Sequence, residues 1–183
     1  MKRASCVLLF AAFLVSCSGI TLNSANPPAD VRTIQDVPFY DDTGRQCGPA
    51  SLAAVMNYWR SRTGSSSLLS PEKISAEIYS SGARGTLGTD LESYAKKNGF
   101  HTMQYSGSVN DLKDNVLKGI PVIILVDYGI LFYQRNHFLV VTGYSGDGIM
   151  VHSGRENKNI SFAALEKIWR KTGNWTLIVK TQD

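Results

Sequence analysis

The chain has 183 residues, which is enough for one domain with a sizeable core. Apolar residues make up 43% of it and charged residues 19%, and both values are ordinary for a globular protein. The net charge is +4, of which Lys2 and Arg3 supply two charges, and the chain has no basic run. We therefore expect no nucleic-acid partner.

The first 17 residues have the pattern of an export signal. A basic start precedes an apolar run at 7–15, which is too short to span a bilayer as a permanent helix. The run ends in Leu14-Val15-Ser16-Cys17, which resembles the bacterial lipobox, where the cysteine is acylated and becomes the first mature residue. An ordinary cleaved signal is the alternative. The pattern predicts a lipid anchor at Cys17 in the bacterial cell envelope, and Ser18 favours the periplasmic face of the outer membrane.

The cysteine count singles out Cys47. Cys6 lies in the export signal and Cys17 would carry lipid, so Cys47 is the remaining thiol in a compartment that favours disulfides. A lone thiol there is open to oxidation, which favours a functional role over a structural one. Residues 18–36 are rich in Ser, Asn, Pro and Asp and predict a flexible tether, which leaves 37–183 as the domain.

Helical patterns dominate the first part of the domain. After an extended lead-in at 37–40, a helix is predicted over about 49–62, because Pro49 suits a first helical position and apolar residues recur along one face. It would carry Cys47 at its N-terminus, where free N–H groups and the helix dipole lower a thiol pKa. Three more helices are predicted from their caps and stops: one starting at Pro71 with Ser70 as cap, one at 90–98 with Thr89 as cap, and one at 109–118 closed by Gly119.

Strand patterns dominate the second part. The continuous β-branched run at 121–126 predicts a central strand buried on both faces. The segments 137–144 and 148–152, joined by a tight turn at 145–148, predict a hairpin. The remaining predictions are a strand at 100–105, a short helix at 162–169 with Ser161 as cap, and a last strand at 175–180. Helices first and an antiparallel sheet second indicate a single-domain α+β fold.

Nucleophilic chemistry at Cys47 needs a nearby base and donors for an oxyanion. His101 opens a modest strand, whereas His137 begins a strongly apolar one, where a histidine is either exposed at the strand end or used. Hairpin pairing places His152 opposite Val141, give or take one residue, and so away from His137. We therefore favour His137 as the base. One cysteine and three scattered histidines lack the close pairs of a zinc site, so we predict no metal and no other cofactor.

Two motifs carry a resemblance to a known family. Val37-Pro38-Phe39 followed by Gln46-Cys47-Gly48-Pro49-Ala50-Ser51-Leu52 resembles the start of the bacteriocin-leader-processing (double-glycine) peptidases, which are papain-like cysteine peptidases. The segment His137-Phe138-Leu139-Val140-Val141-Thr142-Gly143-Tyr144 resembles their histidine motif. The similarity runs over about 36–180. It implies a papain-like α+β fold, with N-terminal helices packed on an antiparallel β-sheet, in which Cys47 is the nucleophile and His137 the general base.

The sequence departs from the family pattern at two positions. The family usually has a glutamine about five residues before the cysteine, which donates its amide to the oxyanion, but Asp42 stands in that region. Gln46 is the other candidate, although it adjoins Cys47. The family's third catalytic residue is usually an Asp of an Asp-Pro pair, and Ser153 stands in its place. The His-Ser-Gly stretch here and the closing aromatic pattern resemble an exported lipoprotein branch of the family.

Two hypotheses follow. The first is an exported, lipid-anchored thiol peptidase or amide hydrolase that acts on an extended peptide through a dyad of Cys47 and His137. The second is a non-catalytic peptide-binding module, a pseudo-peptidase, on the same fold. Both imply a peptide or protein partner, and contact with the membrane through the N-terminal lipid.

Overall fold

The structure is a computed structural model that describes residues 30–42 and 46–181. The helices in these ranges are α1 (Cys47–Arg62), α2 (Pro71–Ile78), α3 (Gly88–Lys97), α4 (Val109–Leu117) and α5 (Phe162–Trp169), which the short 3-10 helix η1 (Arg170–Thr172) follows. The strands are β1 (Arg32–Thr33), β2 (Phe100–Ser106), β3 (Val122–Asp127), β4 (Asn136–Tyr144), β5 (Gly148–Ser153), β6 (Glu156–Ser161) and β7 (Trp175–Thr181). None of these helices is long and apolar enough to cross a membrane. The predicted export signal, with Cys17, lies outside the described residues.

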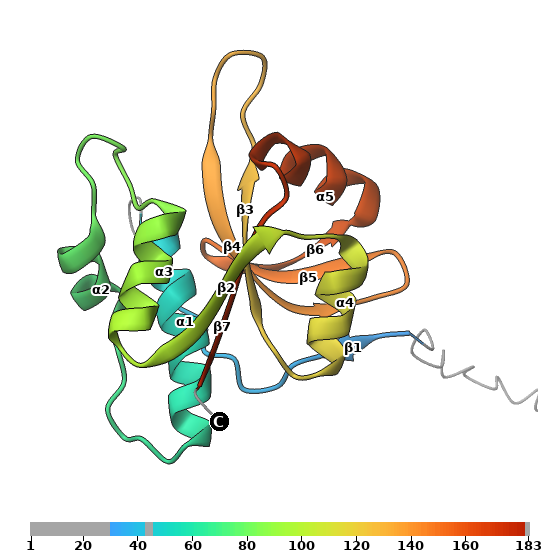
Figure 1. Ribbon diagram of the computed structural model, residues 1–183. Helices are drawn as coiled ribbons and strands as arrows, with labels where there is room; N and C mark the ends of the chain where they lie inside the picture. Colours follow the sequence, from blue (N-terminus) through green and yellow to red (C-terminus); the bar gives the residue numbers. More distant parts are fainter. Residues whose placement is uncertain (1–29, 43–45, 182–183) are drawn as a thin grey trace, which may run out of the picture.

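The strands form one antiparallel sheet in the order β2-β7-β3-β4-β5-β6, and β1 also pairs with β4 (Figure 1). β3 and β4 lie in the interior of the sheet, and their register places His137 opposite Val126. β4 and β5 form the predicted hairpin, in which His152 lies opposite Val140, within one residue of its predicted partner. The pairing confirms that His137 and His152 are separated along the ladder.

Helices cover both faces of the sheet (Figure 1). On one face α1, α2 and α3 share a core with the sheet that includes Leu52 and Ile123. On the other face α4 and α5 share a second core that includes Leu112 and Ile124. Successive residues of β3 therefore enter opposite cores, as side chains do along a strand. This arrangement explains why β3 has a continuous apolar sequence and confirms the prediction of a central strand.

α1 is buried on all sides over most of its length. Every residue from Gly48 to Tyr58 is buried, although the sequence predicted a single apolar face. The one amide in this stretch, Asn57, donates to the Tyr40 hydroxyl at 2.7 Å and to the Leu69 carbonyl at 2.8 Å, and accepts from the Leu69 N–H at 2.9 Å. Because these bonds satisfy the buried amide, the helix can run through the core and hold Cys47 at its start.

Two glycines allow helix starts to approach the sheet closely. A Cβ on Gly48 would lie 3.3 Å from the Phe138 ring, and a Cβ on Gly88 would lie 2.5 Å from the Trp175 ring. The first contact brings the N-terminus of α1 against β4. The second brings the N-terminus of α3 against β7. A side chain at position 88 would push the start of α3 away from the sheet, whereas at position 48 the neighbouring side chains would need to move by only a few tenths of an ångström.

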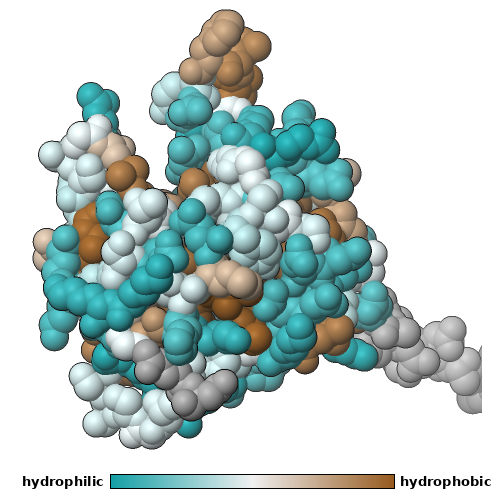
Figure 2. All heavy atoms as spheres, in the orientation of Figure 1, coloured by the Kyte–Doolittle hydropathy of each residue, from teal (hydrophilic) through white to brown (hydrophobic). Residues whose placement is uncertain are grey.

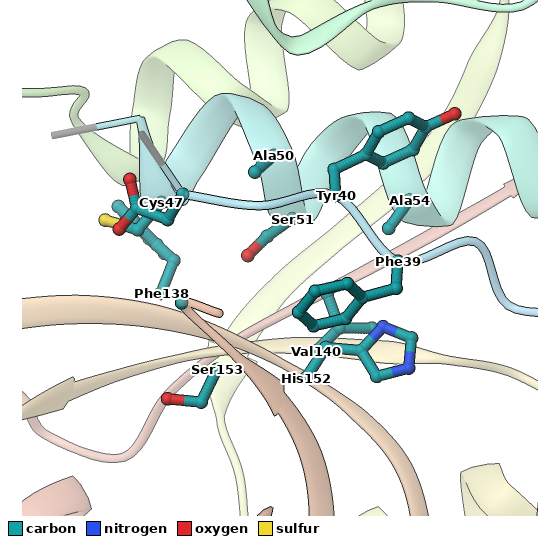
Figure 3. A pocket seen from close by; sticks show the side chains of 12 residues that line it. Phe39, Tyr40, Cys47, Ala50, Ser51, Ala54, Phe138, Val140, His152 and Ser153 are labelled. Atoms are coloured by element: carbon teal, nitrogen blue, oxygen red, sulfur yellow. The ribbon is translucent and has the colours of Figure 1, made fainter. Parts of the chain in front are cut away.

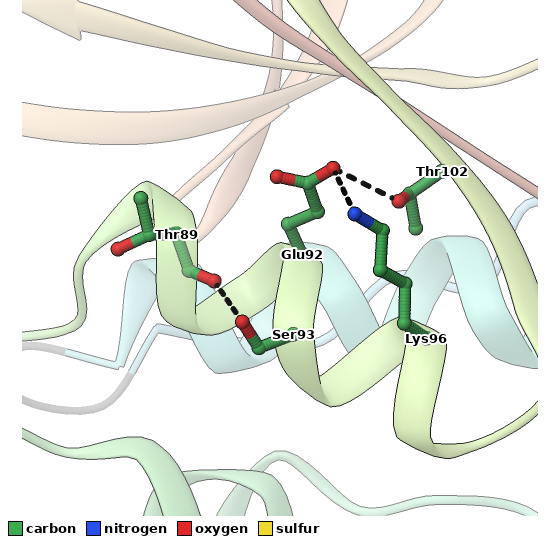
Figure 4. Close-up of polar contacts among 5 residues, drawn as sticks. All are labelled: Thr89, Glu92, Ser93, Lys96 and Thr102. Carbon is green, nitrogen blue, oxygen red and sulfur yellow. Dashed lines mark hydrogen bonds and ion pairs between the residues drawn. The ribbon is translucent and has the colours of Figure 1, made fainter.

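Glu92 ties α3 to β2. Its carboxylate accepts a hydrogen bond from the Thr102 hydroxyl at 3.1 Å and pairs with the Lys96 ammonium at 2.9 Å (Figure 4). The Lys96 side chain is 58% exposed, so we expect the ion pair to contribute no more than about 1 kcal/mol. The burial of Leu91 on the same helix is the larger source of stability.

Most predicted elements are confirmed. α2 and α5 begin after their predicted caps, Ser70 and Ser161. The prediction that Thr89 caps α3 is wrong, because the helix already starts at Gly88 and the Thr89 carbonyl accepts a bond from the Ser93 hydroxyl within the first turn (Figure 4). β6 was not predicted, because it is a polar edge strand whose residues are mostly exposed.

The tether prediction for 18–36 is wrong at its C-terminal end. β1 pairs with Gly143 and Tyr144 of β4, and the N–H of Ile34 donates to the Thr142 carbonyl at 2.7 Å. Ile34 is buried. A Cβ on Gly143 would lie 2.6 Å from a carbonyl oxygen of β1, so the glycine makes this pairing possible. The fold therefore includes residues 32–34, which the prediction placed in the tether.

Candidate active site

Cys47 and His137 come together at one end of the sheet. Cys47 is the first residue of α1, and His137 is the second residue of β4. The Cys47 sulfur, one imidazole nitrogen of His137 and one carboxylate oxygen of Asp42 all lie within 4.8 Å of one another. The sequence singled out all three residues, and the fold brings His137 next to Asp42 and Cys47 from far along the chain.

Asp42 is oriented by two hydrogen bonds. Its N–H donates to the Gly154 carbonyl at 3.1 Å, and its Oδ1 accepts from the Gln46 N–H at 2.8 Å. Its other oxygen, Oδ2, lies 3.8 Å from Nδ1 of His137, which is too long for a hydrogen bond but close enough for a strong electrostatic effect. A single imidazole nitrogen is near both the carboxylate and the thiol. Asp42 therefore approaches His137 on the Cys47 side, whereas the orienting acid of a catalytic triad binds the opposite nitrogen.

Ser153 and Gly154 lie beyond the other side of the imidazole. A Cβ on Gly154 would lie 4.0 Å from Nε2 of His137, so the turn after β5 passes close to that nitrogen. Ser153 is the last residue of β5 and is buried. Among the described residues, no hydrogen bond joins its hydroxyl to His137, and its role as a third catalytic residue stays a prediction.

Gln46 precedes α1 directly. Its backbone N–H is already bonded to Asp42, and its side-chain Oε1 is buried without a hydrogen-bond partner among the described residues. The N–H groups of Cys47 and Gly48 in the first turn of α1 have no helical acceptor and lie near the Cys47 sulfur. Cys47 can therefore supply one oxyanion donor from its own backbone, while a contribution from Gln46 stays a prediction.

Burial favours the uncharged forms of both Cys47 and His137. Burial raises the pKa of the Cys47 thiol, the Asp42 carboxylate raises it further, and the backbone of Phe138 opposes the rise. Burial lowers the pKa of the His137 imidazole and outweighs the opposite effect of Asp42. The sequence predicted a lowered thiol pKa from the helix N-terminus. That prediction is wrong, because the loss of water around the sulfur outweighs the helix contribution.

A cavity of about 20 Å³ lies beside Cys47. Figure 3 shows Cys47 at one end of it and Phe39 with His152 at the other. The His152 ring packs edge-on against Phe39, with ring centroids 5.1 Å apart, and burial lowers the pKa of His152. His152 lines the same cavity as Cys47, which the sequence did not predict, because the two residues come together only through the packing of α1 on the sheet. His101 is exposed on β2.

Comparison with protein-family profiles matches residues 34–177 to the Peptidase_C39 like family. The chain belongs to this family. Members of this family are cysteine peptidases. The match begins at Ile34, in agreement with the early start of the folded domain. No curated protein matches the chain.

Solved structures share the fold at low sequence identity. A protein described as a C39-like peptidase from Bacillus anthracis superposes with a TM-score of 0.65 and 17% identity, covering 84% of this chain and 99% of its own. The peptidase domain of Streptococcus ComA, a bifunctional ABC transporter of a quorum-sensing pathway, gives 0.60 and 23%, covering 80% and 97%. A double-glycine-motif protease from an AMS/PCAT transporter, in complex with the leader peptide, gives 0.63 and 21%, covering 85% and 98%. These similarities confirm the predicted papain-like α+β fold.

Proposed function

We propose that the protein is a thiol-dependent peptidase or amide hydrolase, with Cys47 as nucleophile and His137 as general base. The proposal is carried by the approach of the Cys47 sulfur and a His137 nitrogen to within 4.8 Å at the start of α1. Because burial favours the uncharged thiol and imidazole, His137 takes the thiol proton as the sulfur attacks the carbonyl carbon. The proton then passes to the leaving amine, and water hydrolyses the thioester.

The cavity beside Cys47 favours small residues at the cleaved bond. Its volume is only about 20 Å³, and Phe39, Phe138 and Val140 are among the side chains that line it, so the space beside the sulfur is restricted. An extended peptide with glycine or alanine next to the scissile bond fits this restriction. The neighbour solved with a leader peptide is a protease for double-glycine motifs, which supports the same preference here.

The hairpin between β3 and β4 offers an apolar surface beside the site. Ile130, Leu131, Phe132 and Tyr133 at its tip are 76%, 93%, 102% and 73% exposed, and they form the brown projection at the top of Figure 2. The hairpin leads directly into β4 and His137 (Figure 1). A run of exposed apolar side chains is typical of an interaction surface. We propose that this hairpin tip binds apolar residues of the peptide or protein substrate.

Cleavage of matched peptides by the full chain tests this function. We expect mass spectrometry to find new termini in a peptide with Gly-Gly at its centre, fewer with Leu-Leu there, and none with Cys47→Ala. The double variant Leu131→Ser/Phe132→Ser should raise KM with kcat unchanged. The control variant Leu117→Ser, at an exposed apolar position on α4, should change neither constant. A wild type that cleaves no peptide while its Cys47 still reacts with iodoacetamide would refute the proposal.

The second candidate is a non-catalytic peptide-binding module. The observation in its favour is Asp42, whose carboxylate stands near the sulfur, where it opposes both the thiolate and an oxyanion. A module of this kind would bind the Gly-Gly peptide with equal affinity in wild type and Cys47→Ala and release it intact. Turnover by wild type would exclude it.

We also infer a lipid anchor at Cys17 in the bacterial cell envelope. The support is the lipobox-like Leu14–Cys17 pattern after a short apolar run, together with the neighbouring Ser18, which favours the periplasmic face of the outer membrane. Cys17→Ala should stall processing or release the protein from membranes on fractionation. Unchanged membrane association of that variant would contradict the anchor.

A further inference from the structure

Asp42, Cys47 and His137 form a cluster of three metal-ligating groups. A carboxylate oxygen, a sulfur and an imidazole nitrogen lie within 4.8 Å of one another, and the carboxylate and imidazole are 3.8 Å apart. The sequence argued against a zinc site because it lacks closely spaced ligand pairs. The fold instead brings together ligands from the segment before α1, the start of α1 and the start of β4. Spacing along the chain is therefore the wrong criterion for this site.

Two of the three ligands are oriented by the backbone. Asp42 is held through its Oδ1 by the Gln46 N–H at 2.8 Å and through its own N–H by the Gly154 carbonyl at 3.1 Å, which leaves Oδ2 free to face His137. His137 is held by the pairing of β4 with β3. Partners that orient ligands in this way typically change metal affinity by about 10–100-fold.

The separations suit a tetrahedral Zn²⁺ after a small adjustment. Zn²⁺ binds sulfur at about 2.3 Å and imidazole nitrogen or carboxylate oxygen at about 2.0–2.2 Å, so its ligand atoms lie about 3.3–3.6 Å apart. Asp42 and His137 are already close to this separation. The Cys47 sulfur needs to move by about 1 Å, which rotation of its side chain supplies. Three protein ligands leave the fourth position of a tetrahedral Zn²⁺ open.

The charges also favour a divalent cation. The carboxylate of Asp42 lies 3.8 Å from a nitrogen of the His137 imidazole, and a neutral imidazole is the form that binds metal. The carboxylate of Asp42 and a thiolate at Cys47 would repel each other without a cation, because their ligand atoms lie within 4.8 Å of one another. A bound Zn²⁺ balances both negative charges within the site.

We propose that Asp42, Cys47 and His137 bind Zn²⁺ reversibly and that the bound metal switches the site off. Binding breaks the S–H bond of Cys47 and forms a sulfur–zinc bond, and the proton goes to the solvent. With the sulfur and the imidazole nitrogen both on the metal, neither a nucleophile nor a base remains. The inhibition rests on the proposed peptidase function, whereas the binding does not.

Titration of the chelator-treated full chain with Co²⁺ in detergent tests the binding without any substrate. We expect a near-ultraviolet sulfur–cobalt band and the visible bands of a tetrahedral ion, release of one proton per metal, and loss of the bands when Zn²⁺ is added. Asp42→Asn keeps the shape and the acceptor for Gln46 but removes the charge, and should weaken binding at least about tenfold. Asp41→Asn, the exposed neighbouring carboxylate, should bind as wild type.

The outcomes separate this inference from the proposed function. Equal Co²⁺ affinity in wild type and Asp42→Asn, or a sulfur–cobalt band that persists in His137→Ala, would overturn the three-ligand site. A wild type that cleaves peptides, shows no sulfur–cobalt band and keeps its cleavage rate in Zn²⁺ would contradict the metal site. The proposed peptidase function would be unaffected by that result. Co²⁺ binding that depends on Asp42, in a protein that cleaves no peptide, would support the metal site and contradict the proposed peptidase function.

Discussion

The two walls of the candidate site are built differently. The sheet wall carries His137 on β4, which is paired with β3 on one side and β5 on the other. The N-terminal wall carries Asp42 in a segment without regular secondary structure, where one hydrogen bond to Gly154 and one from Gln46 hold it. Cys47 stands where the walls meet, as the first residue of the buried helix α1.

This difference separates what positions the dyad from what sets its reactivity. The distance between Cys47 and His137 depends on core packing, including the close approach of Gly48 to Phe138. Asp42 contributes little apolar burial but places a carboxylate near both reacting groups. We therefore expect substitution of His137 in the sheet wall to abolish catalysis, and substitutions at position 42 to tune it with little effect on the fold.

The largest expected effect is at His137. His137→Ala should lower kcat/KM for a peptide that wild type cleaves by about 100–10,000-fold, because it removes the general base. His152→Gln should cause a much smaller loss, since His152 lies opposite Val140 on the ladder and is separated from His137. Circular dichroism should show that both variants fold. A larger loss of kcat/KM in His152→Gln than in His137→Ala would show that His152 is the general base. It would also contradict the view that His137 is the essential residue of the sheet wall.

Asp42→Gln should raise the rate. It replaces a carboxylate that repels the developing oxyanion by an amide that can donate to it, and one good donor typically changes kcat by about 100–1000-fold. The measurement is thiol-dependent hydrolysis of a peptide ester or amide, with Asp41→Asn as the control for a general charge effect. A fall in rate would give Asp42 a catalytic or substrate-binding role of its own and make the N-terminal wall as essential as the sheet wall.

A smaller effect is expected on the reactivity of the thiol. The carboxylate of Asp42 raises the pKa of Cys47, so Asp42→Asn should lower that pKa and increase the thiolate fraction near pH 7. Each pKa unit changes this fraction about tenfold, and we expect alkylation by iodoacetamide to accelerate by about 2–10-fold. The midpoint of the pH–rate profile should move to lower pH. An unchanged midpoint would leave burial as the sole cause of the raised pKa.

The sheet wall could be predicted from the sequence, because its determinants are local and periodic. The β-branched run of β3 indicates burial on both faces, and the tight turn at 145–148 sets the register of the β4–β5 hairpin to within one residue. β1 was not predicted, because its two residues, Arg32 and Thr33, are polar and exposed. This strand is defined by its pairing with β4. A strand that depends on a distant partner leaves no pattern of its own.

The residues of the N-terminal wall could be predicted from the sequence, but the directions of their side chains could not. The sequence identified Cys47 and flagged Asp42, but the direction of the carboxylate depends on the Gly154 carbonyl, which lies far away in the chain. The thiol pKa was predicted with the wrong sign, because the helix N-terminus is visible in the sequence while the burial of the sulfur depends on the whole fold. Contacts of this kind require the tertiary structure.

The smallest expected effect concerns stability in acid. The sheet wall carries two half-buried imidazoles, His137 and His152, and partial burial lowers the pKa of each below its ordinary value of 6.5. The unfolded chain therefore binds more protons than the folded protein as the pH falls below about 6.5, and the free energy of unfolding decreases until the folded-state pKa values are passed. Tm measured across this range should fall by a few degrees, since about 1 kcal/mol corresponds to roughly 2–4 °C for a domain of this size.

Two variants test which groups cause the fall in Tm. His152→Gln should make the fall in Tm shallower, whereas His101→Gln, at an exposed position on β2, should leave the pH dependence of Tm unchanged. A fall that is equally steep in all three proteins would place the acid-sensitive groups outside the sheet wall.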